Sequence, residues 1–308
     1  MSALTDSMIG LIMREAASRA ARIVRTMRFS FESAIKPAHD GTLTDLVTSA
    51  DRAAQEAIVR VLREMTPHFG IIAEEAHLHV EPEAGNPAAY SWTVDPLDGT
   101  KAFGRMQSHG IAVMIALINW ADEVVAACVM DVMTGEMYYT RPGSPKVHRM
   151  DHTGAHLRLD LLDPTRSLAD QYLLVRKNPW KFPVRIRRRL IPGADVYGSL
   201  FKDFEIEGGS IGLSFARLWK GEVGGVLLTG DNPNLPWDWA PVVGLSQRLG
   251  YVFLRLEPQE NSKLIPLPFT IETQDPQAPG CPILIVHETH VDVVSRHFYK
   301  PYEGGGGD

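Results

Sequence analysis

The chain has 308 residues, a formal net charge of −6 and a hydrophobic content of 44%, the composition of a globular protein large enough to bury a substantial core. The acidic balance argues against a nucleic-acid partner, although a local basic site for a small anion remains compatible with it. The two cysteines, Cys128 and Cys281, stand in no metal or redox spacing and indicate buried thiols. Because no secretory signal and no apolar stretch of about 20 residues is visible, we expect a cytoplasmic protein without a membrane partner.

The first half of the chain is predicted to contain two helices and a sheet. Apolar residues recur every three or four positions over residues 7–27 and again over 51–65, where Pro67 ends the pattern. Short apolar runs at 70–73 and 91–94 each end in acidic residues and are typical of buried strands. Three β-rich runs, at 110–118, 123–132 and 136–140, are separated by turn-like segments and predict an antiparallel meander.

The second half alternates predicted strands with predicted helices. Strands are expected at 172–175, 225–229, 251–256 and 282–286, and helices at 211–219, 239–249 and 290–297. Residues 141–170 lack periodicity and mark a boundary. We therefore expect an α/β fold with an N-terminal α+β subdomain over residues 1–150, a C-terminal α/β subdomain over 151–303 and a flexible tail at 304–308.

Residues 95–100, Asp-Pro-Leu-Asp-Gly-Thr, are the most informative segment. Pro96 and Gly99 disfavour an interior strand or helix, so we expect a tight loop that aims the Asp95 and Asp98 carboxylates and the Leu97 carbonyl at one point. Such crowded oxygen ligands suit Mg²⁺ or Mn²⁺, which would also relieve the repulsion between the acids. Asp, Pro and Gly are equally favoured in ordinary turns, so the segment alone fits either interpretation.

Further acids follow other predicted elements. Glu74 and Glu75 come directly after the strand at 70–73, Asp51 stands at the start of the second helix, and Asp238 precedes the helix at 239–249. These carboxylates are numerous enough for two cations, which together can stabilise both the attacking and the leaving oxygen in a phosphoryl displacement.

Four stretches resemble the inositol monophosphatase superfamily, in the order in which that family carries them. They are Asp-Leu-Val-Thr-Ser-Ala-Asp at 45–51, Ala-Glu-Glu at 73–75, Val-Asp-Pro-Leu-Asp-Gly-Thr-Lys-Ala-Phe at 94–103, and Pro-Trp-Asp-Trp-Ala-Pro at 236–241. The third matches the family signature in full, and the resemblance covers nearly the whole chain. It implies a layered αβαβα sandwich, a homodimer, and Mg²⁺-dependent hydrolysis of a small phosphorylated metabolite by water activated at the metal.

The resemblance also implies which residues bind the metals. Glu74, Asp95 and the Leu97 carbonyl would hold one Mg²⁺, while Asp95, Asp98 and Asp238 would hold a second. Two or three ions per site are expected, with Mn²⁺ as a substitute.

The catalytic roles implied by the resemblance fall on three residues. Thr100 and Glu74 would orient and deprotonate the attacking water, and Asp51 would act beside them, although Asp51 also fits a plain helix-start acid and Thr100 a plain helix N-cap. Glu75 is either an outer acid of the site or a solvated strand end.

Substrate contacts are implied at the phosphate end and at the organic end. The implied residues are Asp98, Gly99, Thr100, Gly212, Leu213 and Asp231. Backbone N–H groups at Gly99 and Thr100 would receive phosphate oxygens. Leu213 replaces a commonly small or hydroxylic residue, and Asp231 also fits an ordinary turn, so the organic half of the substrate is the open question.

Several alternatives remain open from sequence. The preferred activity is that of an inositol-monophosphatase-like phosphomonoesterase. The alternatives are a histidinol-phosphate phosphatase, a 3′(2′),5′-bisphosphate nucleotidase, or a non-catalytic regulatory binding protein of the same fold. The basic run at 185–189 favours a solvated helix face, and the histidine pairs at 148 and 152 and at 287 and 290 lack a third zinc ligand.

Overall fold

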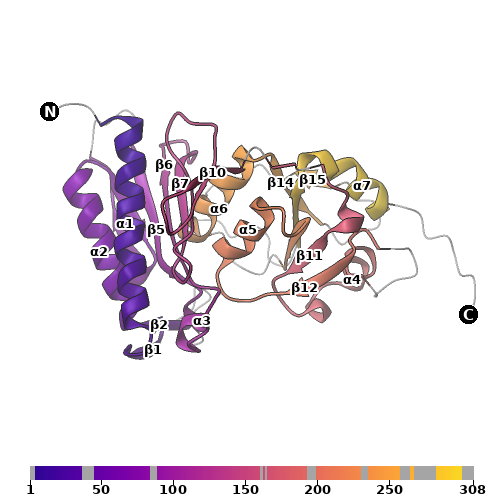
Figure 1. Cartoon of the computed structure of the whole chain (residues 1–308), viewed down its shortest axis with the longest axis horizontal. Coiled ribbons are helices and arrows are strands. Elements are labelled where there is room, and N and C mark those ends of the chain that lie inside the picture. Colours follow the sequence, from indigo (N-terminus) through magenta and orange to yellow (C-terminus); the bar gives the residue numbers. More distant parts are fainter. Residues whose placement is uncertain are drawn as a thin grey trace, which may run out of the picture.

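The protein is a sandwich of five alternating helical and sheet layers, as the computed structural model shows (Figure 1). Helices α1 and α2 cover one face of a large sheet, α5 and α6 fill the space between it and a second sheet, and α4 and α7 cover the far face of the second sheet. The structure describes residues 4–36, 45–83, 89–159, 162, 163, 165–192, 199–229, 235–256, 264–266 and 282–299. The predicted αβαβα architecture is confirmed.

The helices of the outer and middle layers follow the predicted amphipathic patterns. Their bounds are α1 (Asp6–Met27), α2 (Ser49–Met65), α3 (Thr100–Gly104), α4 (Val184–Leu190), α5 (Ile211–Trp219), α6 (Pro236–Arg248) and α7 (Val291–Tyr299), with 3-10 turns at Glu75–His77, Leu168–Asp170, Pro179–Lys181 and Glu288–His290. Helix α6 begins at Pro236, three residues before the predicted start, because Pro is well suited to the first helical position.

The first sheet has eight strands and carries the predicted meander. From edge to edge they are β10 (His156–Arg158), β9 (His148–Met150), β8 (Met137–Thr140), β7 (Val124–Asp131), β6 (Ala112–Ile118), β5 (Ser91–Asp98), β3 (Gly70–Ala73) and β4 (Leu78–Val80). Strand β6 is apolar throughout because both of its faces are buried. Ala112, Met114 and Ala116 pack in the middle layer, while Val113 and Ile115 pack under α1 and α2.

Strand β5 is longer than the sequence predicts. It runs through Asp98, although Pro96 and Gly99 indicated a loop from Asp95 onward, so that prediction is wrong in its placement of the strand end. Asp95 pairs with Met114 and Asp98 with Ala112, with a register shift between them. The irregularity accommodates Pro96, which cannot donate to a sheet hydrogen bond, and keeps both carboxylates at the strand end.

The second sheet has six strands and forms the fourth layer. Its order is β12 (Asp203–Ile206), β11 (Tyr172–Val175), β13 (Gly225–Leu228), β16 (Ile283–His287), β14 (Tyr251–Arg255) and β15 (Ile265–Pro266). Strands β12, β11 and β13 are parallel, so their carboxyl ends lie at one edge. A separate two-stranded sheet pairs β1 (Ser33–Lys36) with β2 (Asp45–Thr48).

Helix α6 lies close against the first sheet because Gly244 has no side chain. A Cβ at this position would collide with Val124 of β7, whose own Cβ would be 2.9 Å away. Only hydrogen fits there, so the backbone of α6 contacts the side chains of β7 directly. This contact helps to hold α6 against the first sheet, where the helix also packs on β5 and β6.

The domain boundary near residue 150 stays a prediction. Strands β9 and β10, on either side of it, pair with each other at the edge of the first sheet. The predicted tail at 304–308 and Cys281 lie outside the described residues.

Candidate active site

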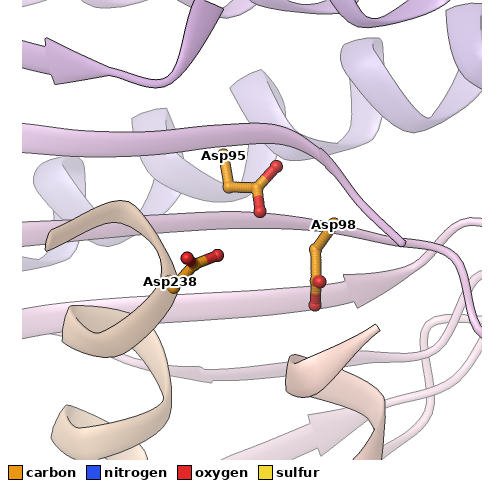
Figure 2. Close-up of side chains that lie close together, drawn as sticks. All are labelled: Asp95, Asp98 and Asp238. Carbon is orange, nitrogen blue, oxygen red and sulfur yellow. The ribbon is translucent and has the colours of Figure 1, made fainter. Parts of the chain in front are cut away.

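Three aspartates from distant parts of the chain point into one space at the end of β5 (Figure 2). Asp95 and Asp98 project from β5, and Asp238 projects from the first turn of α6. One carboxylate oxygen of each lies within 4.8 Å of one oxygen of the others. Among the described residues, no histidine joins a group of this kind.

Burial and mutual repulsion disfavour the charged form of these acids. Asp95 and Asp98 are buried, at 2% and 8% exposure. Burial raises the pKa of Asp95 well above its ordinary value, and the charges of Glu74, Asp98 and Asp238 raise it further. The charged form of a carboxylate in this position is stable only when cations offset the negative charge of the surrounding acids.

Asp98 is held from the opposite side by the start of α5. Its Oδ2 accepts hydrogen bonds from the Ser210 hydroxyl and, at 2.8 Å, from the Gly212 backbone N–H. Burial raises the pKa of Asp98, while the nearby Arg176 guanidinium and these donors act to lower it. The Ile211 backbone N–H is a further donor to this carboxylate.

Ser210→Ala tests whether this contact orients Asp98. We expect the affinity for Mg²⁺ to fall about 10- to 100-fold, the usual cost of losing a group that orients a ligand. Ser210 also caps α5 by accepting the Leu213 N–H at 3.0 Å, so about 1 kcal/mol of stability should be lost as well.

Thr5→Ala is the matched control, because Thr5 caps α1 by accepting the Met8 N–H and lies outside the acidic cluster. Its stability should fall similarly while Mg²⁺ affinity, measured by titration calorimetry, stays unchanged. Equal Mg²⁺ affinity in the two variants would show that Ser210 only caps the helix.

Glu74 is placed by a constrained turn after β3. Its backbone N–H donates to the Val94 carbonyl at 3.1 Å, and its charge acts on Asp95. Gln55 of α2 fixes the next residue, accepting the Glu75 N–H at 2.9 Å and donating to the Glu75 carbonyl at 2.8 Å. Ala76 then takes a positive φ of 56°. Glu75 is buried at 5% exposure and is therefore not a solvated strand end.

Thr100 and Asp51 are joined on the α2 side of the cluster. The Thr100 hydroxyl lies 3.2 Å from Asp51 Oδ1 and 3.1 Å from the Leu97 carbonyl, to either of which it can donate. Gly99, whose φ is 95°, occupies the cap position of α3, so Thr100 is not a plain N-cap. Asp51 accepts both the Thr48 N–H and the Thr48 hydroxyl, and burial raises the pKa of Asp51 to about 6.

Two predicted substrate residues have clear local roles, and a third is undescribed. Gly212 bonds Asp98 through its N–H, and a Cβ there would meet Met114 Sδ at 2.6 Å. Leu213 packs partly buried against the middle-layer core. Asp231 lies outside the described residues.

Ser210 and Arg176 belong to the site but were not predicted as site residues. Ser210 carried one signal, an N-cap serine before the predicted helix at 211–219. Arg176 follows β11 and gave no signal of its own. Ser210 and Arg176 lie far from Asp98 in the sequence, and only the packing of the layers brings them to it.

The donor set suits hard divalent cations. Carboxylate oxygens from Asp95, Asp98 and Asp238 converge within ligand-sharing distance, with the Glu74 charge beside them, and Mg²⁺ and Mn²⁺ prefer oxygen ligands of this kind. The described residues therefore fit the metal that the sequence implies.

The sequence profile of the inositol monophosphatase family matches residues 7–290. The chain belongs to this family. Among curated relatives, the Nus factor SuhB of Salmonella typhimurium is 31% identical over 229 residues, covering 73% of this chain and 76% of the relative. The inositol-1-monophosphatase of Caulobacter vibrioides is 33% identical over 99 residues, covering 32% of this chain and 37% of the relative.

Solved structures place the fold in the same family. An inositol monophosphatase from Thermotoga maritima has a TM-score of 0.65 at 19% identity, covering 93% of this chain and 94% of that one. The extragenic suppressor protein SuhB of Bartonella henselae has the same score and identity, with 94% and 98% coverage. These similarities confirm the inositol monophosphatase fold. No described helix is both long and apolar enough to span a bilayer.

Proposed function

We propose that this family member is a Mg²⁺-dependent phosphomonoesterase acting on a small phosphorylated metabolite, in the manner of an inositol monophosphatase. The observation that supports it most is the convergence of Asp95, Asp98 and Asp238 at the buried end of β5. Acids that repel one another at a buried site destabilise a protein unless they serve a ligand.

Each residue of the site has a proposed role in metal binding or in positioning the attacking water. Asp95, Asp98 and Asp238, with Glu74 and the Leu97 carbonyl, would hold the cations. When bound, these would supply positive charge to the phosphate and lower the pKa of a nearby water. Thr100, donating its own proton to Asp51 or Leu97, presents its hydroxyl oxygen as an acceptor for a proton of that water. Glu74 is the proposed base.

The direct test is phosphate release with and without Mg²⁺ on a substrate panel. It comprises inositol 1-phosphate, histidinol phosphate, fructose 1,6-bisphosphate and adenosine 3′,5′-bisphosphate. We expect turnover of at least one compound that requires Mg²⁺, accepts Mn²⁺ in its place and disappears in Asp98→Asn. Equal phosphate release by the wild type and Asp98→Asn would refute the proposed phosphatase activity. A strong preference for one compound of the panel would decide among the alternative substrate classes.

A second candidate is a regulatory binding protein without turnover. It is favoured by the Salmonella relative, whose name is that of a Nus factor rather than of an enzyme. This candidate predicts a folded protein that binds Mg²⁺ yet releases phosphate no faster than Asp98→Asn. A homodimer and a cytoplasmic location remain part of the proposal, and sedimentation analysis tests the former.

A further inference from the structure

Arg176 lies at the carboxyl end of β11, beside the candidate active site. Along this strand Leu174 packs in the middle layer and Val175 in the outer layer, so alternation places Arg176 on the side of α5 and the aspartates. Asp98, Glu207 and Asp238 all act electrostatically on its guanidinium. A half-buried arginine thus stands next to the acids that the proposed function assigns to metal binding.

Three hydrogen bonds fix the plane of this guanidinium. Nη2 donates to the Gly209 carbonyl at 2.7 Å, and Nη1 donates to the Ser210 carbonyl at 2.7 Å and to the Ser214 hydroxyl at 2.5 Å. These bonds tie the side chain to the turn that opens α5. The side chain is therefore oriented before any ligand arrives.

The same bonds leave one edge of the guanidinium available. Arginine has five N–H donors in a rigid fork, and three are used here. Nη2 and Nη1 donate to the consecutive carbonyls of Gly209 and Ser210, so the end-on edge of the guanidinium, between the two Nη atoms, is occupied. Within the part of the chain that the structure describes, Nε–H and the second Nη2–H have no hydrogen-bond acceptor. Together they form the side-on edge, which matches two oxygens of a carboxylate or phosphate.

The phosphate to be cleaved is not the natural occupant of that edge. Gly99 closely approaches the turn at Ser210, because a Cβ on Gly99 would lie only 2.9 Å from the Ser210 nitrogen. This turn therefore stands between the start of α3 and Arg176. An oxyanion on the Arg176 side would belong to the organic half of a substrate whose ester phosphate is bound by the metals.

We propose that Arg176 is a specificity-determining residue that binds a second oxyanionic group, carboxylate or phosphate, of the substrate. The proposal rests on the proposed phosphatase function and narrows its substrates to phosphomonoesters that carry another anionic group. Metal binding favours this role, since cations that offset Asp98 and Asp238 leave only Glu207, which is paired with Arg217, among the acids that act on the Arg176 charge.

Binding of unreactive phosphonates to the full chain in Mg²⁺ tests the proposal apart from catalysis. The three probes are propylphosphonate, 3-phosphonopropionate and propane-1,3-bisphosphonate, whose P–C bonds are not hydrolysed as esters. Two of these probes, 3-phosphonopropionate and propane-1,3-bisphosphonate, carry an anionic group at each end. Titration calorimetry should show that the wild type binds at least one of them about tenfold or more tightly than propylphosphonate. Which one it prefers distinguishes a carboxylate from a second phosphate.

Substitutions at Arg176 and Ser214 distinguish recognition of a second anionic group from structural support of the turn that opens α5. Measured in saturating Mg²⁺, Arg176→Gln should lose the preference while its affinity for propylphosphonate changes little, and Arg176→Lys should retain part of it. Ser214→Ala removes one tether of the guanidinium but not its open edge, so it should keep most of the preference.

Two outcomes would overturn the proposal: equal wild-type affinity for all three probes, or a preference that survives in Arg176→Gln. If Arg176→Gln weakens every probe equally, Arg176 only supports the turn and the specificity role is refuted. Failure of the phosphatase itself is seen separately, as absent Mg²⁺-dependent phosphate release by the wild type.

Discussion

Replacing Asp95 by Asn is expected to stabilise the metal-free protein and to abolish Mg²⁺-dependent phosphate release. The wild-type carboxylate is buried and repelled by Glu74, Asp98 and Asp238, and a neutral amide removes that repulsion. Its oxygen can still accept the Leu97 N–H that Asp95 Oδ1 accepts at 2.9 Å. The melting temperature without metal should therefore rise by about 2 °C or more, while activity falls at least about 100-fold.

Mg²⁺ should reverse this order of stability. Because a ligand that binds only the native state stabilises it, millimolar Mg²⁺ should raise the melting temperature of the wild type much more than that of Asp95→Asn. Asp163→Asn serves as the control, since among the described residues Asp163 bonds within its own exposed turn, to Thr165. A variant that melts below the wild type without metal, or gains as much from Mg²⁺, would contradict a metal role for Asp95.

Gly99→Ala is expected to have the second large effect, on folding as well as activity. Gly99 has a φ of 95°, and an added Cβ would collide with the Gly110 carbonyl and approach the Ser210 nitrogen. The left-handed backbone and the collision together should cost about 3 kcal/mol. Because Ser210 would be displaced from Asp98, phosphate release should fall further than the loss of folded protein explains.

Gly154→Ala isolates the backbone contribution. Gly154 has a similar φ of 84°, but a Cβ there would meet nothing within 4 Å, so its cost should be about 1 kcal/mol with full activity. Chemical denaturation and phosphate release at matched folded concentration measure both variants. If Gly99→Ala is as mild as Gly154→Ala, the close approach at residue 99 has no role in the site.

The helices and buried strands were predictable because local apolar patterns determine them. The predicted bounds of α5 and β11 agree with the structure, and α1 and α2 differ only at their first turns. The end of β5 was not predictable. Pro96 normally excludes a strand interior, and only the pairing of Asp98 with Ala112 shows that the strand resumes beyond it. Short edge strands such as β12 and β4 were missed because few residues carry their pattern.

The acidic residues of the site could be predicted from the sequence, but the residues that hydrogen-bond to them could not. Glu74, Asp95, Asp98 and Asp238 follow apolar runs or begin helices, positions that chain patterns reveal. The hydrogen bonds that orient them come from residues far away in the chain, such as Ser210 on Asp98. Such partners depend on how the layers pack, which no local spacing encodes.

Gly244 gives the metal site a dependence on a residue that lies outside it. Asp95 and Asp98 belong to one layer and Asp238 to the next, so the gap between their carboxylates depends on how closely the two layers pack. One contact that permits this close packing is that of Gly244 with Val124, where only a hydrogen atom fits between backbone and side chain. We therefore expect substitutions at positions beneath α6 to change the metal preference of the proposed site, since a shift of a few tenths of an ångström is the difference between the ligand spacings of small and large divalent ions.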